Sequence, residues 1–183
     1  MSIETVFNLG EDAFSNLFDL VISRVPSAVP VPAGFDLERE KPRITNFSVP
    51  SSGWESYEID YKTESFSRVS AKVDLSKEIT FDIRVDRNYK MYKFFVNWKN
   101  AVLNSYTGAM GTDDSMDNGL RTSMSVWAIE AGAEGTPIPG TTWKFEGVIC
   151  KSVPEISFDY GSSDPITVSI TLEFLRMNDN ELA

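Results

Sequence analysis

The chain has 183 residues, 42% of them hydrophobic, and a formal net charge of −10 from 17 basic and 27 acidic side chains. This predicts one folded domain over residues 1–183, because typical domains hold roughly 100–200 residues. The acidic balance argues against tight binding to nucleic acid or anionic lipid, whereas it would suit a protein past which DNA moves without sticking.

The first 50 residues predict an arm, two strands and a connector. Residues 1–15 are interpreted as an N-terminal arm, which lacks the features of a secretory signal. Residues 16–23 are apolar and β-branched enough for a strand, and residues 43–49 predict a second strand that Pro50 ends. The run VPSAVPVPAG between them carries three prolines, which remove backbone donors and predict a loop.

The clearest pattern is a strict alternation that predicts a long β-hairpin. Apolar and polar residues alternate over 56–64 and again over 69–75, on either side of a polar turn expected at 65–67. A period of two places successive side chains on opposite faces of a strand. The predicted apolar face consists of Tyr57, Ile59, Tyr61, Val69, Ala71 and Val73. The predicted polar face consists of Glu58, Asp60, Lys62, Glu64, Arg68 and Lys72.

A further strand and one long helix are expected next. Residues 78–85 alternate as the hairpin does, and the period then changes over residues 89–105. Apolar residues at spacings of four, three and four, typical of one helix face, are Met91, Phe95, Trp98 and Val102. Asp86 or Asn88 can accept hydrogen bonds from N–H groups at the start of this helix.

The remainder predicts a loop insertion and four more strands. Residues 106–122 are rich in glycine and acid without periodicity, which indicates a surface loop. Strands are expected at 123–131, 142–150, 152–160 and 166–174. The whole pattern predicts a mainly β (α+β) fold, a β-sandwich or barrel with one long helix.

The residue types argue against catalysis. The chain has no histidine and one cysteine, which excludes a disulfide within the chain and any catalytic group that needs histidine. The acidic stretch 113–119 does not fit a calcium loop, because Met116 and Ser125 stand where oxygen ligands belong. Paired carboxylates such as Glu58 and Asp60 follow an ordinary solvent-facing pattern. No enzyme activity, cofactor or metal is therefore expected.

Two further features are expected to be structural. Cys150 ends an apolar strand, where a buried inert thiol is expected. The aromatic helix face around Phe95 and Trp98 is expected to belong to the core. Neither feature predicts a ligand site.

The alternation of apolar and polar residues in the hairpin is compatible with two arrangements. Its strands could lie inside a closed sandwich formed by one chain. Alternatively, its two edges could pair with neighbouring copies and close a barrel of several subunits, since proteins normally cover or pair exposed edges.

Residues 44–102 combine a strand, a proline-marked turn, a long hairpin, a strand ending in an acid, and a helix of the form aromatic-x-x-F-x-x-W. In this order they resemble the central region of tail-tube proteins of contractile-tailed phages and related contractile injection systems. The positions that carry the resemblance are Pro50, the hairpin from Tyr57 to Val73, Asp86, Asn88, Tyr92, Phe95 and Trp98. Residues 143–177 and 16–23 are similar to the last and first strands of that family.

The resemblance implies six subunits per ring, with the hairpin joining a continuous inner β-barrel and with rings stacked into a tube. The hairpin's apolar face would pack outward on the helix layer, and its polar face would line a lumen that conducts DNA, or toxin in a phage-derived machine. Because three acids and three bases cancel on that polar face, other strands at 42–49, 123–131 or 142–150 must set the lumen charge.

The same resemblance implies a structural protein of the virion, assembled in the host cytoplasm. Its partners would be further copies of itself and the tail sheath, tape measure, baseplate and tail-terminator proteins, with DNA passing without specific binding. Two alternatives remain open. One is a baseplate tube-initiator of the same fold, and the other is a monomeric β-sandwich binding module or carbohydrate-active enzyme.

Overall fold

The computed structural model describes residues 18–104, 106–111, 119–129, 137–158, 161 and 164–178. The predicted arm 1–15 and residues 112–118 of the predicted loop 106–122 lie outside this part. The elements in chain order are β1 (Phe18–Ile22), α2 (Leu37–Glu40), the 3-10 turn η1 (Lys41–Arg43), β2 (Ile44–Ser48), β3 (Ser52–Tyr61), β4 (Glu64–Leu75), β5 (Glu78–Arg84), α3 (Lys90–Val102), β6 (Thr122–Ile129), β7 (Pro137–Ser152), β8 (Thr167–Glu173) and β9 (Arg176–Asn178). The predicted mainly β fold with one long helix is confirmed.

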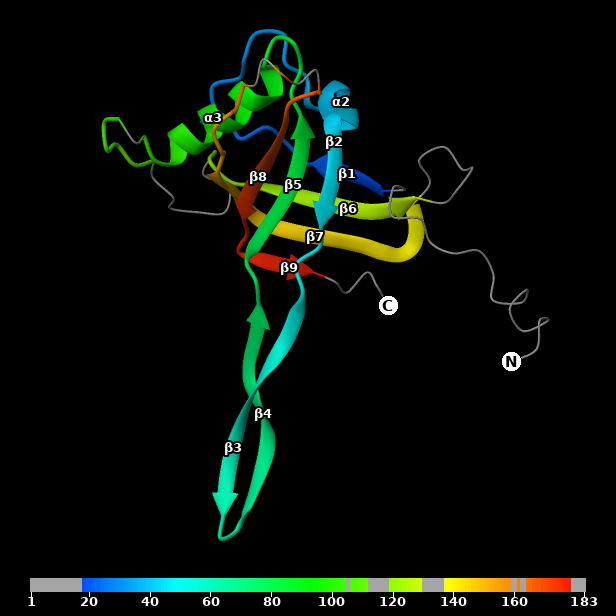
Figure 1. Ribbon diagram of the computed structural model, residues 1–183, viewed down its shortest axis with the longest axis vertical. Helices are drawn as coiled ribbons and strands as arrows, with labels where there is room; N and C mark the ends of the chain where they lie inside the picture. Colours follow the sequence, from blue (N-terminus) through cyan, green and yellow to red (C-terminus); the bar gives the residue numbers. More distant parts are fainter. Residues whose placement is uncertain are drawn as a thin grey trace, which may run out of the picture.

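The strands form a body and a separate ribbon (Figure 1). In the body, the strand order is β1-β6-β7-β8-β5-β2, with β9 also paired to β7, and every pairing is antiparallel. The ribbon is the β3–β4 hairpin, a two-stranded sheet of its own. The two ends of the body path, β1 and β2, do not pair with each other in the described chain, so the strands do not close into a barrel.

The long strand β7 divides the body into two layers. Its first part pairs with β6 and β9, and its last residues pair with β8. We call the layer of β1, β6, β9 and the first part of β7 the β6 sheet, and the layer of β2, β5, β8 and the end of β7 the β5 sheet. Gly147 lies between these parts, at a register shift and with φ +67°, as expected for a β-bulge that bends a strand.

The core fills the space between the two sheets and α3. Alternate residues of β5 and β8 point into it, and the side chains that are at most 4% exposed there are Ile79, Phe81, Ile83, Val168, Ile170 and Leu172. The helix contributes Met91, Phe94, Phe95 and Trp98, all fully buried. Trp98 Nε1 also donates a hydrogen bond to the Leu120 carbonyl at 2.7 Å. Phe95 and Trp98, which were expected in the core, are among these buried side chains.

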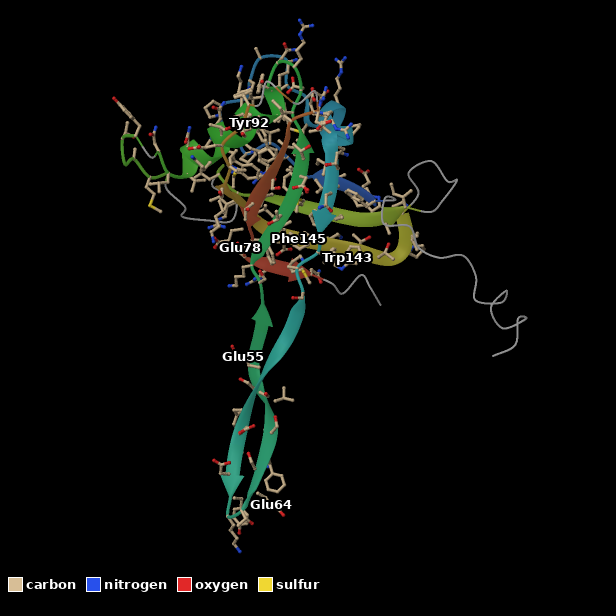
Figure 2. The ribbon with its side chains drawn as sticks, viewed as in Figure 1. Glu55, Glu64, Glu78, Tyr92, Trp143 and Phe145 are labelled. Atoms are coloured by element: carbon tan, nitrogen blue, oxygen red, sulfur yellow. The ribbon has the colours of Figure 1, made fainter. Side chains whose placement is uncertain are left out.

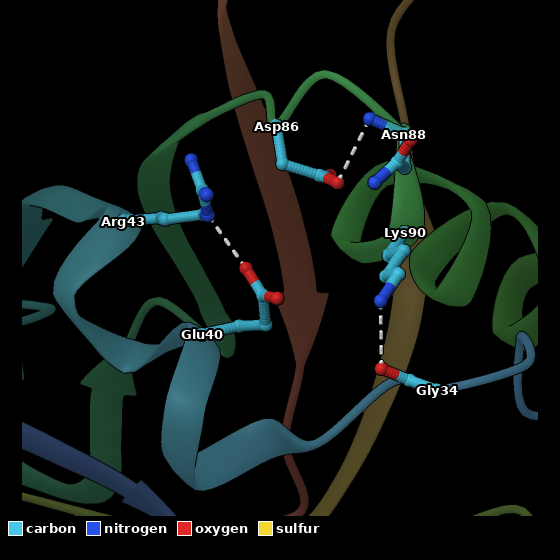
Figure 3. Close-up of polar contacts among 6 residues, drawn as sticks. All are labelled: Gly34, Glu40, Arg43, Asp86, Asn88 and Lys90. Carbon is cyan, nitrogen blue, oxygen red and sulfur yellow. Dashed lines mark hydrogen bonds and ion pairs between the residues drawn. The ribbon is translucent and has the colours of Figure 1, made fainter.

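The start of α3 is tied to the segment that precedes β2 (Figure 3). Lys90 Nζ donates to the carbonyl of Gly34 at 2.9 Å. Asp86 accepts a hydrogen bond from the backbone N–H of Asn88 at 3.0 Å, whereas Tyr89, the residue before the helix, has φ +58° and makes no side-chain cap. Asp86 therefore stabilises the turn before the helix rather than capping the helix itself.

Several predicted boundaries were wrong. The hairpin turns at residues 62–63 rather than 65–67. No strand follows Ser152 over the described residues 153–158, where Pro154 lacks a backbone donor. Strand β7 instead begins at Pro137, ahead of the strand expected to start at residue 142. The short elements α2, η1 and β9 were not predicted, since a few residues carry too little periodicity to detect.

Candidate assembly surface

The β3–β4 hairpin projects from the body without another strand beside it in the described chain (Figure 1). Its strands pair with each other through nine registered pairs, from Ser52 opposite Leu75 to Tyr61 opposite Glu64. Figure 2 shows Glu55 and Glu64 along this ribbon, far from Trp143 and Phe145 in the body. The interpretation that the hairpin lies within a closed sandwich of one chain is therefore wrong.

One face of the ribbon is apolar and exposed. Ile59 pairs directly with Phe66, and opposite residues of an antiparallel pair lie on the same face. We call this surface the aromatic face; it consists of Tyr57 (49% exposed), Ile59 (38%), Tyr61 (65%) and Phe66 (50%). The expected packing of this face on a helix layer does not occur among the residues that the structure describes.

The register corrects the predicted division into one polar and one apolar face. Arg68 pairs with Tyr57, and Glu64 pairs with Tyr61, so both lie on the same side of the ribbon as the aromatic face rather than on the polar side. Val69, expected with the apolar residues, pairs with Ser56 on the opposite face. A turn centred on 65–67 would place odd-numbered residues of one strand opposite odd-numbered residues of the other. The observed two-residue turn at 62–63 places odd-numbered residues opposite even-numbered ones. A shift of this kind moves every side chain of one strand to the other face.

The remaining predicted hairpin residues fall into three groups. Glu58 and Asp60 pair with Ser67 and Ser65, on the face opposite the aromatic one. Lys62 lies in the turn with φ +57°, and its Nζ is 5.5 Å from the centre of the Tyr61 ring. The side chains of residues 71–75, which include Ala71, Lys72 and Val73, lie outside the described part of the structure.

The outer edge of β2 is a second surface available for assembly. Within the described chain, β2 pairs with β5 alone. Its sequence, ITNFS, contains neither proline nor lysine, the residues that natural proteins use to block an exposed edge. A groove of about 360 Å³, lined by residues of β1 and β2 among others, separates the two ends of the body path.

Three further properties of the described residues concern metal binding, the single thiol and membrane-spanning helices. They contain no group of three or more histidine, cysteine, aspartate or glutamate side chains that could hold a metal ion. Cys150 is buried, as predicted, and burial raises the pKa of its thiol to about 12. None of the helices in this part is long and apolar enough to cross a membrane.

Comparisons with known proteins give the fold. No protein-family model and no curated protein matches the sequence. A solved structure of an extracellular contractile injection system, the PVC sheath-tube complex in its extended state, contains a chain 13% identical, with a TM-score of 0.62 over 97% of both chains. The anti-feeding prophage (AFP) tube-terminating cap gives 15% identity and a TM-score of 0.63 over 93% of this chain and 91% of the other.

A third likeness is to the sixfold-symmetrised AFP baseplate, at 12% identity with a TM-score of 0.60 over 93% of this chain and 96% of the other. At such low identities the likeness is one of fold. It covers between 93% and 97% of this chain. The chain therefore has the fold found in these contractile injection systems, as that resemblance predicted.

Proposed function

We propose that this protein is a structural subunit whose rings stack into the inner tube of a contractile phage tail or of a related injection machine. The observation that carries the proposal is the aromatic face, an apolar surface on a projecting ribbon that nothing in the described chain covers. A second copy can cover it, and open sheet edges can be satisfied by the same contact.

Covering the aromatic face would contribute favourable free energy to assembly, which offsets part of the cost of association. Fully burying a large apolar side chain contributes about 1.5–3 kcal/mol. The four side chains of the aromatic face are between 38% and 65% exposed, so covering them would contribute several kcal/mol per hairpin on the same scale. In a ring, each copy places its hairpin on one neighbour and contacts the hairpin of the other neighbour. The free energy from covering the aromatic face is therefore gained once per copy.

A hairpin that binds a different surface of the next copy makes a head-to-tail contact, which closes into a ring when the rotation between copies allows. Six copies per ring are supported by the likeness to a sixfold-symmetrised baseplate. Open edges at β2 would let adjacent copies continue the sheet. The ring size and the stacking of rings belong to the proposal.

The proposed partners follow from the same comparisons. The similar chains come from a sheath-tube complex, a cap and a baseplate, which supports contacts with sheath, terminator and baseplate proteins. We also propose as partners the tape measure protein and the DNA, or toxin, that passes through the tube. The subunit catalyses no reaction in this role, and it acts in a phage-tail-like particle assembled in the producing cell.

Electron microscopy of the purified protein tests the proposal. The wild-type chain should form rings or tubes in a concentration series. The variant Ile59→Ser/Phe66→Ser should stay folded, with the circular dichroism spectrum and melting temperature of the wild type, yet form neither. A matched control is Ser65→Ala/Ser67→Ala on the opposite hairpin face, which should assemble normally.

Two results would contradict the proposal. One is a wild-type chain that remains monomeric throughout the concentration series. The other is an aromatic-face variant that assembles as readily as the wild type. Rings that never stack would instead favour the tube-initiator of a baseplate, the alternative with the same fold.

A further inference from the structure

A groove of about 420 Å³ lies between α3 and the segment that follows β1. Ala28 and Pro30 of that segment line one wall, and residues at the end of α3 line the other. The volume falls within the ~300–1,000 Å³ that is usual for binding sites. We call this site the α3 groove.

Three asparagines line the α3 groove on the helix side. Asn97 and Asn100 lie three residues apart on α3, a spacing that places them on one side of the helix, and Asn104 follows just after its end. A carboxamide side chain has two donor hydrogens and an acceptor oxygen, the same kinds of groups as a peptide backbone. This asparagine row can therefore bind the backbone of another segment without selecting that segment's side chains.

Much of the hydrogen-bonding capacity of the asparagine row is unused in the described chain. Asn97 Nδ2 donates to the Pro30 carbonyl at 2.8 Å, which fixes this side chain but uses only one of its donors. Asn104 Oδ1 accepts two backbone hydrogen bonds of the turn after it, at 3.0 and 3.1 Å, whereas its amide group donates to no described residue. Asn100 forms no side-chain hydrogen bond there. The row thus offers donors and acceptors to an incoming backbone.

The α3 groove is already formed in the single subunit. The Ala28 N–H donates to the Gly119 carbonyl at 2.9 Å, and the Gly111 N–H donates to the Val102 carbonyl at 2.9 Å. These bonds tie the segments that line the groove to each other and to the helix. A Cβ atom at Gly111 would lie 2.6 Å from the Ala101 carbonyl oxygen, so the chain packs directly on the helix at that point. A preformed site binds without the cost of ordering its own residues.

The helix beside the groove is basic, although the chain as a whole is acidic. Residues 87–111 contain no acid and four cations, Arg87, Lys90, Lys93 and Lys99. Lys90 Nζ donates to the Gly34 carbonyl at 2.9 Å (Figure 3). Lys93 Nζ donates to the Asn88 carbonyl at 3.4 Å. Both acceptors are uncharged, so these hydrogen bonds leave the positive charge of the helix able to attract an acidic segment.

The segment 1–17 of the same chain has the complementary charge. It lies outside the described residues, and its sequence contains no base and three acids, Glu4, Glu11 and Asp12. Seventeen residues can span up to about 60 Å when extended. The segment therefore has both the charge and the length to bind at a distance from the start of β1.

The direction of β1 favours a neighbour's groove over the chain's own. Residues 23–30 follow β1 and lead to the groove wall. The segment 1–17 therefore joins β1 at the end that is farther from the groove, and Figure 1 shows β1 starting on the other side of the body from the end of α3. In a head-to-tail ring, that side of one copy would face the α3 side of the next.

We infer that the α3 groove holds part of the segment 1–17 of the neighbouring copy, bound through its backbone by the asparagine row and attracted by the basic helix. The inference rests on the proposed function and adds a contact between copies that is separate from the hairpin. Two contacts on one pair of subunits reinforce each other, because the first raises the effective concentration for the second.

Disulfide trapping tests the inference, because Cys150 is buried and the chain has no other cysteine. Asn8→Cys places a thiol in the segment 1–17, and Ala28→Cys places one in the groove wall. Chains that carry one substitution each are mixed, allowed to form rings and oxidised, and the rate at which linked pairs appear is measured on denaturing gels. The matched control replaces Ala28→Cys by Thr80→Cys, which is exposed on the outer side of the β5 sheet.

The expected result is that Asn8→Cys links to Ala28→Cys at least about tenfold faster than to Thr80→Cys, because binding in the groove raises the effective concentration of the two thiols. Adding Asn100→Leu to the Ala28→Cys chain should slow the link about two- to tenfold, since a hydrogen bond to the bound backbone is lost. The melting temperature should stay the same, because Asn100 forms no side-chain hydrogen bond in the described chain.

Four results would contradict the inference. Rings that form while both mixtures link at the same slow rate would overturn it and leave the groove to a segment of another protein. A double variant, Asn8→Cys/Ala28→Cys, that links only within single chains would show that each groove holds the segment of its own chain. An unchanged rate with Asn100→Leu would exclude the role of the asparagine row. A wild-type chain that forms no rings would contradict the proposed function itself, and the inference with it.

Discussion

Strands β3 and β5 have the same alternating pattern but different surroundings. On β5, the apolar residues Ile79, Phe81 and Ile83 are at most 1% exposed. On β3, Tyr57 and Ile59 are 49% and 38% exposed. The difference is that β5 has strands on both sides and packs Phe81 against Phe95 of the helix, whereas β3 has only β4 beside it in the described chain. Alternation therefore shows that a strand has an apolar face, but it leaves open whether the same chain covers that face.

The largest expected difference between the two regions comes from removing one aromatic side chain from each. Trp98→Ala should lower the free energy of unfolding by about 3–5 kcal/mol, because it leaves a cavity in the core, and because it also removes the hydrogen bond to Leu120. Phe66→Ala should change it by no more than about 0.5 kcal/mol, since exposed side chains contribute little to the subunit. Urea denaturation of both variants measures the difference; equal losses would contradict the division into body and ribbon.

A smaller effect is expected at the bend of β7. Gly147→Ala should destabilise the subunit by about 2–3 kcal/mol, because φ is positive there and because a Cβ atom would lie 2.7 Å from Leu175 Cδ1. Gly108→Ala is the matched control, since Gly108 also has a positive φ but nothing within 4 Å of the added atom. Its cost should be nearer 1 kcal/mol. Thermal unfolding would show whether contact with Leu175 adds to backbone strain, and equal costs would exclude it.

An effect that is absent at neutral pH is expected from Cys150. The pKa of Cys150 is raised from 9.0 to about 12 in the folded chain, so between these values the unfolded chain ionises while the folded chain keeps its proton. The stability of the wild type relative to Cys150→Ala should therefore be constant below about pH 9 and fall above it, by at most about 1.4 kcal/mol per pH unit. Unfolding measured at several pH values tests this. In the Cys150→Ala background, an exposed thiol from Ser67→Cys should show no such fall.

Much of the fold could be predicted because it is encoded locally. The strand periods of β5 and β8 and the helical spacing of Phe95 and Trp98 are properties of short segments, and the structure confirms them. The turn of the hairpin was misplaced, since Ser65 and Ser67 suggest a turn as strongly as Lys62 does. Phe66 was consequently missed as part of the aromatic face. The alternation of Phe66 and Arg68 with Ser65 and Ser67 is the signal that could have found it.

The polar outer surface of the β5 sheet could not be assembled from the sequence, although its strands β2, β5 and β8 were predicted. Ser48, Thr80 and Thr171 are distant in the chain and become neighbours only through the pairing of β2, β5 and β8. Likewise, the role of Gly147 depends on Leu175, which returns beside it with β9.

The sequence by itself determined the long helix, most of the strands and which of their side chains are apolar, because periodicity depends on neighbours along the chain. Only the tertiary structure decided the register of the hairpin, the division of β7 between two sheets and the exposure of the aromatic face. These depend on turn length and on contacts between distant segments. An alternating pattern is compatible with several such pairings.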